Sequence, residues 1–331
     1  MKPLPTLRTF LQEEGVQGIF IKGDSSIRYF TGFTGGESLL YVDALRAVLI
    51  TDSRYILQAQ QQAPECEILE HQHGLFSVVD QVRPAWRLAL DGDYFSYTEA
   101  TALQKALPKA SFKNVNLVFL RAVKSPEEQR KMFKAAAIAD DAFHELIPHI
   151  KVGRRESELA AELEYNMRKR GAQKTSFDTI VASGVRSALP HGVASNKVIE
   201  EGDFVTFDFG CIYDGYCSDM TLAANELGEE VLFPGKTGIE VDQAVRDFIA
   251  SKGYGAYFGH GLGHGVGLDI HEKPNLNKGN PDPIPVGAIV TVEPGIYLPG
   301  KGGVRIEDTV IVTEWGCERL TLVEKELMEI L

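Results

Sequence analysis

Four carboxylates and one imidazole lie in strand-like, largely apolar segments of the last third of the chain. They are Asp208, Asp219, His264, Glu293 and Glu307, in the segments FVTFDFGCIYDGYCSDMT, GHGLGHGVGLDIHEKP, VTVEPG and VRIED. A folded protein does not concentrate this much like charge in apolar surroundings unless cations neutralise it. The sequence therefore predicts a fold that gathers these five residues around bound metal ions.

The first two carboxylates flank a hairpin signal. Asp214-Gly215 stands between two alternating segments and predicts a two-residue turn. This turn pairs Asp208 with Thr221, and the alternation of side chains then puts Asp219 on the same sheet face, roughly 7–8 Å from Asp208. Carboxylates that converge from these positions can grip two metal ions about 3.5–4 Å apart. For this pair alone, two solvent-facing aspartates on an edge hairpin are the alternative.

The other two carboxylates lie at strand ends. Glu293 follows the β-type run over 288–292 and precedes a Pro-Gly turn, which suits the rim of a site. A strand predicted over 303–307 places Arg305 and Glu307 on one face, where the arginine can orient the carboxylate. An exposed Arg–Glu pair, which contributes little to stability, is the alternative.

The histidines gather in a glycine-rich segment. Residues 259–267 contain His260 and His264, and His271 follows seven residues after His264. Glycines let the backbone turn tightly and approach a ligand closely. Three histidines within twelve positions favour a site over isolated structural histidines, whereas His191 is a weaker candidate on its own.

The first part of the chain alternates strand-like and helix-like segments. Strands are predicted over 18–21, 47–51 and 116–120, and a helix is predicted over 55–60. None of these segments gathers metal ligands.

A strong helix start follows at Ser125, where serine caps the helix, Pro126 fits the first helical position and Glu128 closes a capping box. We expect this helix to reach about Leu146 and a second helix to cover 156–170. The domain boundary is placed just before the first of them, which gives domains of residues 1–122 and 123–331.

Composition limits the partners, the location and the cysteine chemistry that are expected. The 331 residues carry a net charge of −12, with no basic stripe, which argues against a nucleic-acid or anionic-membrane partner. No signal peptide or membrane-spanning run is evident, so a cytoplasmic location is expected. The four cysteines follow no zinc or redox spacing. A bridge between Cys211 and Cys217 is conceivable, and reduced thiols are favoured.

The same motifs resemble the M24 metallopeptidases, the pita-bread fold of Xaa-Pro aminopeptidases, Xaa-Pro dipeptidases (prolidases) and methionine aminopeptidases. Two aspartates eleven positions apart around the hairpin, then GHGLGHGVGLDIHE, VEPG and VRIED, occur in family order, and SFDTIVASGVRSALPHG (176–192) adds to the match. RYFTGFTGGESLLYV (28–42) and TDSRY (51–55) resemble the creatinase-type N-terminal domain, which methionine aminopeptidases lack. The resemblance implies an α/β (α+β) protein of the proline-directed branch. A creatinase-like N-terminal α/β domain would precede a pita-bread domain with a curved antiparallel sheet covered by helices.

The resemblance also implies roles for single residues. Asp208 would bind one metal ion, Asp219 and Glu307 would bridge two, His264 would hold the second, and Glu293 would be a ligand that also takes the proton from the bridging water. His191 and His271 would stabilise the transition state. His260 and Arg305 are assigned to substrate binding.

The implied reaction is attack of metal-bridged hydroxide on the carbonyl carbon of the bond before proline, in short peptides with proline at the second position. Two divalent ions are expected. The carboxylate-rich site favours Mn²⁺, with Co²⁺, Zn²⁺ or Fe²⁺ as alternatives. The family also suggests a homodimer.

Two departures from the family pattern bear on the substrate. After Asp219 the chain has Leu222 and Ala223, where the family commonly has arginine and threonine. Asn275 stands where some prolidases place an arginine that can hold a dipeptide carboxylate, which favours an aminopeptidase acting on longer peptides over a strict dipeptidase.

Two further hypotheses are a non-peptidase enzyme on the same scaffold and a binding protein without activity. Both would be expected to lose ligands that this chain retains, so the peptidase is favoured.

Overall fold

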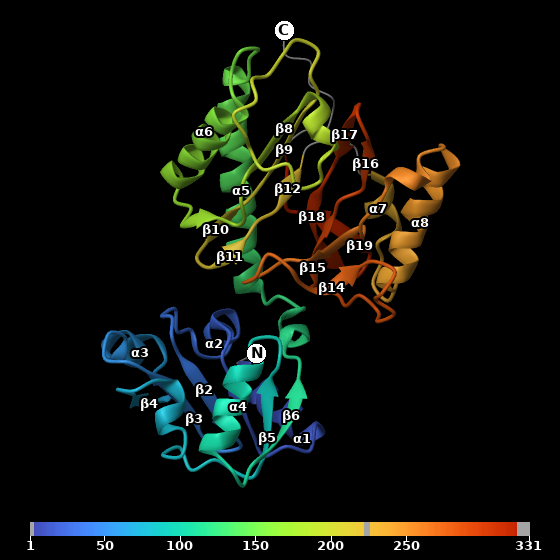
Figure 1. Ribbon diagram of the computed structural model, residues 1–331. Helices are drawn as coiled ribbons and strands as arrows, with labels where there is room; N and C mark the ends of the chain where they lie inside the picture. Colours follow the sequence, from blue (N-terminus) through green and yellow to red (C-terminus); the bar gives the residue numbers. More distant parts are fainter. Residues whose placement is uncertain (1–2, 222–225, 323–331) are drawn as a thin grey trace. The chain divides into compact units, whose positions relative to one another are not determined.

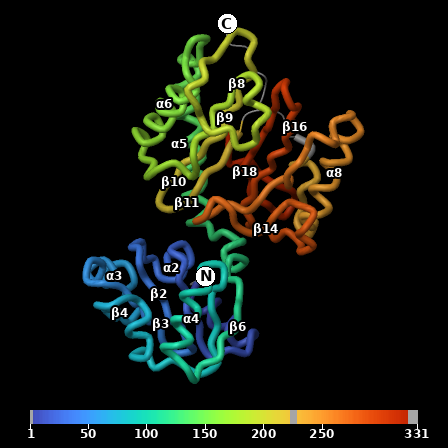
Figure 2. The backbone as a smooth tube through the Cα atoms, viewed as in Figure 1, coloured from blue at the N-terminus to red at the C-terminus, as the bar shows by residue number. Residues whose placement is uncertain are grey.

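The computed structural model of the chain describes residues 3–221 and 226–322 (Figure 1). The chain folds into two compact units, Met1–Leu120 and Arg121–Leu331, a division two residues before the predicted boundary. The backbone of each unit can be followed in Figure 2. The apolar segments predicted as strands over 18–21 and 47–51 are strands, and the helix predicted over 55–60 covers Ile56–Gln62.

The N-terminal unit is built on one mixed sheet with the strand order β4-β3-β2-β1-β5-β6. Its strands are β1 Gly18–Ile21, β2 Leu39–Asp43, β3 Ala47–Thr51, β4 Glu67–Glu70, β5 Arg87–Asp91 and β6 Ser111–Val115. Its α-helices are α1 Pro3–Glu13, α2 Asp24–Thr31, α3 Ile56–Gln62 and α4 Tyr97–Ala106. The central strands carry apolar runs, over 18–21, 39–42, 47–50 and 88–90, because both of their faces are buried. Leu40 and Val42 enter one core, and Leu39 and Tyr41 enter the other.

The prediction of a strand over 116–120 is wrong. The last strand of this sheet ends at Val115, and the Asn116 side-chain oxygen then accepts a hydrogen bond from the Val118 amide at 2.9 Å. This local bond turns the chain into a short 3₁₀ helix over Val118–Arg121. The true edge strand β6 has the polar sequence SFKNV because much of it is exposed. It therefore lacks the apolar run that marks the central strands.

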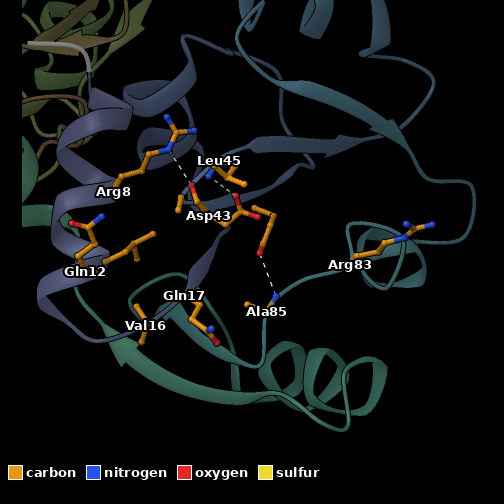
Figure 3. Close-up of a pocket in the computed structure, with 11 residues that line it drawn as sticks. Arg8, Gln12, Val16, Gln17, Asp43, Leu45, Arg83 and Ala85 are labelled. Atoms are coloured by element: carbon orange, nitrogen blue, oxygen red, sulfur yellow. Dashed lines mark hydrogen bonds between the residues drawn. The ribbon is translucent and has the colours of Figure 1, made fainter.

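A pocket of the N-terminal unit is lined by α1, the turn between β2 and β3, and the segment that enters β5 (Figure 3). Its polar groups bond to one another: Arg8 Nε donates to the Asp43 carbonyl at 3.0 Å, and Asp43 Oδ1 accepts from the Leu45 amide at 2.9 Å. At its base the Ala85 amide donates to the Tyr41 hydroxyl at 3.5 Å. Among the described residues, the cluster of three possible metal ligands lies in the C-terminal unit instead.

The C-terminal unit combines short antiparallel sheets with two pairs of helices. Its strands are β7 Lys174–Thr175, β8 Ile180–Ser183, β9 Val205–Phe209, β10 Cys211–Tyr213, β11 Tyr216–Cys217, β12 Met220–Thr221, β13 Gly263–Gly265, β14 Glu272–Leu276, β15 Ile289–Val292, β16 Gly295–Leu298, β17 Gly302–Arg305, β18 Asp308–Thr313 and β19 Gly316–Arg319. Its α-helices are α5 Pro126–Leu146, α6 Glu156–Lys169, α7 Glu226–Val231 and α8 Gly238–Ser251.

The C-terminal unit has two apolar cores, one for each helix pair. Helices α5 and α6 pack against β8 and β10, around a core that includes Phe143, Leu163 and Phe209 (Figure 1). Helices α7 and α8 pack against β19 and β14, and that core includes Val245 and Val290. Two helix-covered half-sheets therefore stand side by side, and the candidate site takes residues from both. No helix in the described ranges is both long and apolar enough to span a membrane.

Both helices predicted at the start of this unit are confirmed. Helix α5 begins at Pro126 with the expected capping box, in which the Glu128 amide donates to Ser125 Oγ and the Glu128 carboxylate accepts from the Ser125 amide at 2.8 Å. Glu128 also accepts from the Tyr216 hydroxyl at 3.0 Å. The start of α5 is therefore fixed to the hairpin that carries two of the candidate ligands.

Replacing Ser125 with alanine should lower the free energy of unfolding by about 1 kcal/mol, because the first turn of α5 loses its side-chain acceptor. Urea denaturation measures this loss. Lys134→Ala, on the exposed side of the same helix, is the matched control and should change stability by less than about 0.5 kcal/mol. Equal losses in the two variants would contradict the cap's contribution.

Candidate active site

The hairpin predicted around Asp214-Gly215 is confirmed, with the predicted register. Asp214 and Gly215 have φ values of 43° and 80°, the left-handed conformation that a type I′ turn requires. Tyr213 pairs with Tyr216, and further along the hairpin Asp208 pairs with Thr221. The ladder is interrupted between β11 and β12, so Asp219 stands just outside a strand. The turn thus fixes where both aspartates lie along the two arms.

The other candidate ligands come from the second half-sheet. His264 lies on β13, between two glycines that allow neighbouring strands to approach closely. A Cβ atom on Gly263 would lie 1.9 Å from the Thr291 carbonyl oxygen, and one on Gly265 would lie 2.4 Å from the Lys273 carbonyl oxygen. The sequence Gly-His-Gly is therefore what lets β13 fit between β14 and β15.

Glu293 follows β15, as predicted. The strand predicted over 303–307 is shorter than expected: β17 ends at Arg305, and Glu307 forms a separate antiparallel bridge with Thr221. The Ile306 amide still donates to the Pro294 carbonyl in the β16–β17 register, but Pro294 has no amide N–H to return the bond, and the strand ends there. The bridge brings the end of the hairpin against Glu307, near the end of the VRIED segment.

Three of the five predicted ligands meet directly. Asp219, His264 and Glu307 each offer one ligand atom, and these atoms lie within 4.8 Å of one another. Glu293 joins them at the edge, where its Oε1 lies 3.4 Å from His264 Nε2. Asp208 instead directs Oδ2 to the Arg305 guanidinium. The structure thus brings all five residues into one region, with Asp208 turned towards the arginine.

The carboxylates of this region are deeply buried, and burial governs their protonation. Asp208 is 6% exposed, Asp219 5% and Glu307 2%. Burial raises the pKa of Asp208 to about 7, against the opposing effect of Arg305. Burial also raises the pKa of Glu293 to about 7, and burial with the neighbouring Glu307 raises the pKa of Asp219 well above its usual value. Without cations, this region cannot hold all its carboxylates in the charged form.

The residues present fit divalent cations. Oδ1 of Asp208 is buried and has no hydrogen-bond partner among the described residues, which leaves it available as a ligand atom. Burial lowers the pKa of His264 to about 4, so its ring is neutral near pH 7 and Nε2 can bind a metal ion. A set of buried carboxylates with one neutral imidazole is a typical ligand set for Mn²⁺ or a related ion.

Threonine hydroxyls that were not among the predicted site residues support the ligands. Thr221 Oγ1 donates to Glu307 Oε2 at 2.9 Å, and Thr309 Oγ1 donates to the Asp219 carbonyl at 2.7 Å. Thr291 Oγ1 donates to Glu293 Oε1 at 3.1 Å and accepts from the His264 amide at 3.0 Å. Each threonine stands two positions from a candidate ligand. The period of two along a strand was therefore the signal that would have identified them.

Arg305 lies among the ligands. Its guanidinium pairs with Asp208, donates to the Pro190 carbonyl at 2.9 Å and lies 3.4 Å from both Thr221 Oγ1 and the Tyr297 hydroxyl. The arginine predicted to bind substrate thus connects a ligand carboxylate to the segment that carries His191.

The three other histidines predicted for the site, His191, His260 and His271, lie near the cluster. The ring of His271 lies 4.4 Å from the ring of His264, and His260 Nε2 lies 3.1 Å from the Tyr297 hydroxyl. His191 is exposed and close enough to both His260 and His271 to contribute to the lowering of their pKa values, which is caused mainly by burial. The structure therefore brings all three imidazoles into the region of the cluster.

The segment that carries His271 is anchored by buried charges. Glu272 lies 3.3 Å from Arg121 and 3.4 Å from Lys124, and its Oε1 accepts from the Asp269 amide at 3.1 Å. Arg121 also pairs with Asp269 at 2.7 Å. This cluster could not be predicted from the sequence, because Arg121 and Lys124 each lie 148 positions from an acidic partner.

Of the three positions that depart from the family pattern, the structure describes one. Leu222 and Ala223 lie outside the described residues. Asn275 is half-buried on β14, and its carbonyl accepts from the Asn280 side chain at 2.8 Å. All four cysteines are free thiols.

Comparison with known proteins decides the family. Residues 130–223 and 221–314 match Metallopeptidase family M24, and residues 3–122 match the Creatinase/Prolidase N-terminal domain. The chain belongs to the M24 family. It is therefore a metallopeptidase, a metal-dependent hydrolase. Its predicted fold class, a creatinase-type N-terminal domain followed by a pita-bread domain, is confirmed.

Proteins named as Xaa-Pro peptidases are similar to this chain over almost its whole length. The Xaa-Pro dipeptidase of Pyrococcus furiosus is 38% identical over 348 residues, which cover 98% of this chain and 99% of that protein. The solved structure of the Xaa-Pro dipeptidase from Bacillus anthracis is 44% identical, covers 99% of both chains and has a TM-score of 0.94. The X-Pro aminopeptidase from Thermotoga maritima is 38% identical, with 94% of this chain and 97% of that one covered and a TM-score of 0.85.

Adding Mn²⁺ to the chelator-treated protein should raise its melting temperature in a concentration-dependent way. A ligand at 100 times its Kd stabilises the folded state by about 2.7 kcal/mol. Asp219→Asn should abolish most of this shift, because the variant removes one charged ligand from the cluster. Glu201→Gln, an exposed carboxylate in a turn, is the control and should keep the full shift. A full shift in the Asp219 variant would place the metal elsewhere.

Proposed function

We propose that the chain hydrolyses the peptide bond before proline, with two divalent cations held by Asp208, Asp219, His264, Glu293 and Glu307. The observation that carries this proposal is the buried cluster of Asp219, His264 and Glu307, with Glu293 at its edge. Mn²⁺ is the proposed metal, because oxygen ligands predominate. Asp219 and Glu307 would help to hold both cations. When bound, the two cations supply a water of lowered pKa and positive charge that stabilises the developing oxyanion.

Glu293 is the proposed general base. The Thr291 hydroxyl donates to Oε1 of Glu293 at 3.1 Å, which restrains the carboxylate. Glu293 would accept a proton from the attacking water and return it to the proline nitrogen as the bond breaks. Two steps of proton transfer are thus assigned to one positioned side chain.

The histidines are proposed to act on the substrate side. His191 and His271 are both exposed beside the cluster, and we assign to them hydrogen bonds to the carbonyl oxygen of the bond being cleaved, where negative charge develops. His260 and Arg305, joined through the Tyr297 hydroxyl, are assigned to substrate binding.

The substrate proposed first is a peptide longer than two residues, as for an aminopeptidase. Asn275 offers no positive charge to a dipeptide carboxylate. Arg305, the cation beside the cluster, already donates to Asp208, Pro190 and Tyr297. A strict Xaa-Pro dipeptidase is the second candidate, and the names of the relatives from Pyrococcus furiosus and Bacillus anthracis favour it. A homodimer and a cytoplasmic location stay predictions.

A peptide panel tests the proposal. The chelator-treated protein is supplied with Mn²⁺, Co²⁺ or Zn²⁺ and given Xaa-Pro, Xaa-Pro-Yaa and Xaa-Ala-Yaa peptides. We expect cleavage before proline, with higher kcat/KM on Xaa-Pro-Yaa than on Xaa-Pro. Higher kcat/KM on Xaa-Pro would establish the dipeptidase instead. Binding of two ions without cleavage of either proline peptide would refute the function.

Glu293→Gln should lower kcat by about 10²–10⁴-fold at saturating Mn²⁺, because the amide cannot accept the proton. The measurement is steady-state hydrolysis of an Xaa-Pro-Yaa peptide, with metal content determined on the same sample. The exposed Glu201→Gln variant should keep its kcat. Undiminished turnover in the Glu293 variant would assign the base elsewhere.

His271→Ala should lower kcat by about 10²-fold while the metal content stays unchanged, because the side chain is proposed to donate to the oxyanion and not to bind metal. Elemental analysis and steady-state kinetics on one preparation separate the two roles. Loss of an ion from this variant would show that His271 is a ligand.

A further inference from the structure

Glu156 is a fully buried carboxylate outside the metal cluster. It is the first residue of α6, and it has no solvent exposure. Its two oxygens accept five hydrogen bonds. Oε1 accepts from the amide and the hydroxyl of Ser183 at 2.7 and 2.8 Å. Oε2 accepts from the amide and the hydroxyl of Ser195 at 3.1 and 2.6 Å, and from Arg186 Nη1.

The donors come from the two ends of one segment. Ser183 is the last residue of β8, and Ser195 lies twelve positions later, so Glu156 joins the two ends of the segment 183–195. Arg186 extends the connection, because its Nη2 donates to the Val193 carbonyl at 3.0 Å. The α6 backbone adds a further bond at this end, from the Ser157 amide to the Ser195 carbonyl at 2.9 Å.

His191 lies within this segment. On the side of the metal cluster, Arg305 donates to the Pro190 carbonyl at 2.9 Å, and the Gly303 amide donates to Ser187 Oγ at 2.9 Å. The segment is therefore held at its base by Glu156 and near His191 by β17. The exposed imidazole itself stands on a short stretch between these anchors.

The anchor at the base depends on the charge of Glu156. Burial alone would raise the pKa of Glu156, but the hydrogen bonds from Ser195 and Ser183 outweigh it, and the pKa is lowered. The helix N-terminus also favours a negative charge there. A neutral amide would turn its NH₂ group towards donors, so buried amides and hydroxyls would lose their acceptor. The two ends of the segment would then separate or shift.

We propose that Glu156 is a positioning residue for His191, which it holds over the metal cluster by joining the two ends of segment 183–195. This inference rests on the proposed function, in which His191 donates to the oxyanion. Glu156 touches neither the substrate nor the ligands. Its effect on the reaction passes through the geometry of one loop, where a displacement of about 1 Å can lower the rate about 10²-fold.

A double-mutant cycle tests the inference on the metal-loaded enzyme. Glu156→Gln should lower kcat and kcat/KM together by about 10- to 100-fold, with unchanged metal content. In the His191→Ala background the same substitution should cost about twofold or less, because the group that it positions is already absent. An equal fold-loss in both backgrounds would overturn the inference and give Glu156 a general structural role.

Two further variants keep the test decisive. Ala160→Gly, a buried position one turn along α6, should lower the melting temperature but leave kcat unchanged in both backgrounds. Arg186→Gln leaves the serine bonds to Glu156 intact. Arg186→Gln should lower kcat by a smaller factor than Glu156→Gln, and this decrease should also disappear in the His191→Ala background. If Glu156→Gln does not fold, Arg186→Gln takes its place in the double-mutant cycle. A decrease in kcat that persists in the His191→Ala background would overturn the inference.

The same experiment separates the inference from the proposed function. If His191→Ala alone leaves kcat unchanged, the role assigned to His191 fails, and with it the role of Glu156. If His191→Ala lowers kcat but Glu156→Gln does not, the proposed function stands and the inference is overturned.

Discussion

Three buried carboxylates and a partly buried fourth, gathered near one neutral imidazole, set the main constraint on the C-terminal unit. Among the described residues, Arg305 is the side chain with a permanent positive charge that forms an ion pair with one of these carboxylates, and its partner is Asp208. Burial raises the pKa values of Asp208, Asp219 and Glu293, so without cations bound protons would offset the negative charge. A scaffold that keeps such groups together in the metal-free state has to resist their mutual repulsion. It does so with strand pairing and short hydrogen bonds, which do not depend on the metal.

The two half-sheets meet at these ligands. The first half supplies Asp208 and Asp219 from one hairpin, and the second supplies His264, Glu293 and Glu307 from three separate segments. The halves are joined by the bridge between Thr221 and Glu307 and by the bond from Thr309 to the Asp219 carbonyl. Cations bound by residues of both halves would add to this junction. Metal binding and the stability of the C-terminal unit are therefore expected to be coupled.

Features that depend on residues close together in the sequence were predicted correctly. An Asp-Gly turn and the period of two were sufficient for the hairpin register, and a serine cap followed by proline was sufficient for the start of α5. The prediction over 116–120 failed because an apolar run does not reveal that Asn116 turns the chain. Glu156 was out of reach for a different reason. An acidic residue at a helix start is ordinary, and its partners lie 27 and 39 positions away, at Ser183 and Ser195.

Glu156 and Asp208 show how the same chemical group takes opposite roles. Both are buried carboxylates of one unit, yet Glu156 accepts five hydrogen bonds while Oδ1 of Asp208 accepts none from the described residues. A carboxylate whose lone pairs are all used has nothing left for a cation, and it serves to fix the backbone around it. A carboxylate with a buried, unused oxygen is costly until a cation binds. Asp208 and His264 stand on paired strands, and Asp219, Glu293 and Glu307 stand at a strand end or on an isolated bridge. Strand pairing therefore holds the ligands despite that cost. The exposed His191 and His271 stand on loops, which the hydrogen-bonded carboxylate of Glu156 and the ion-paired carboxylate of Glu272 keep in place.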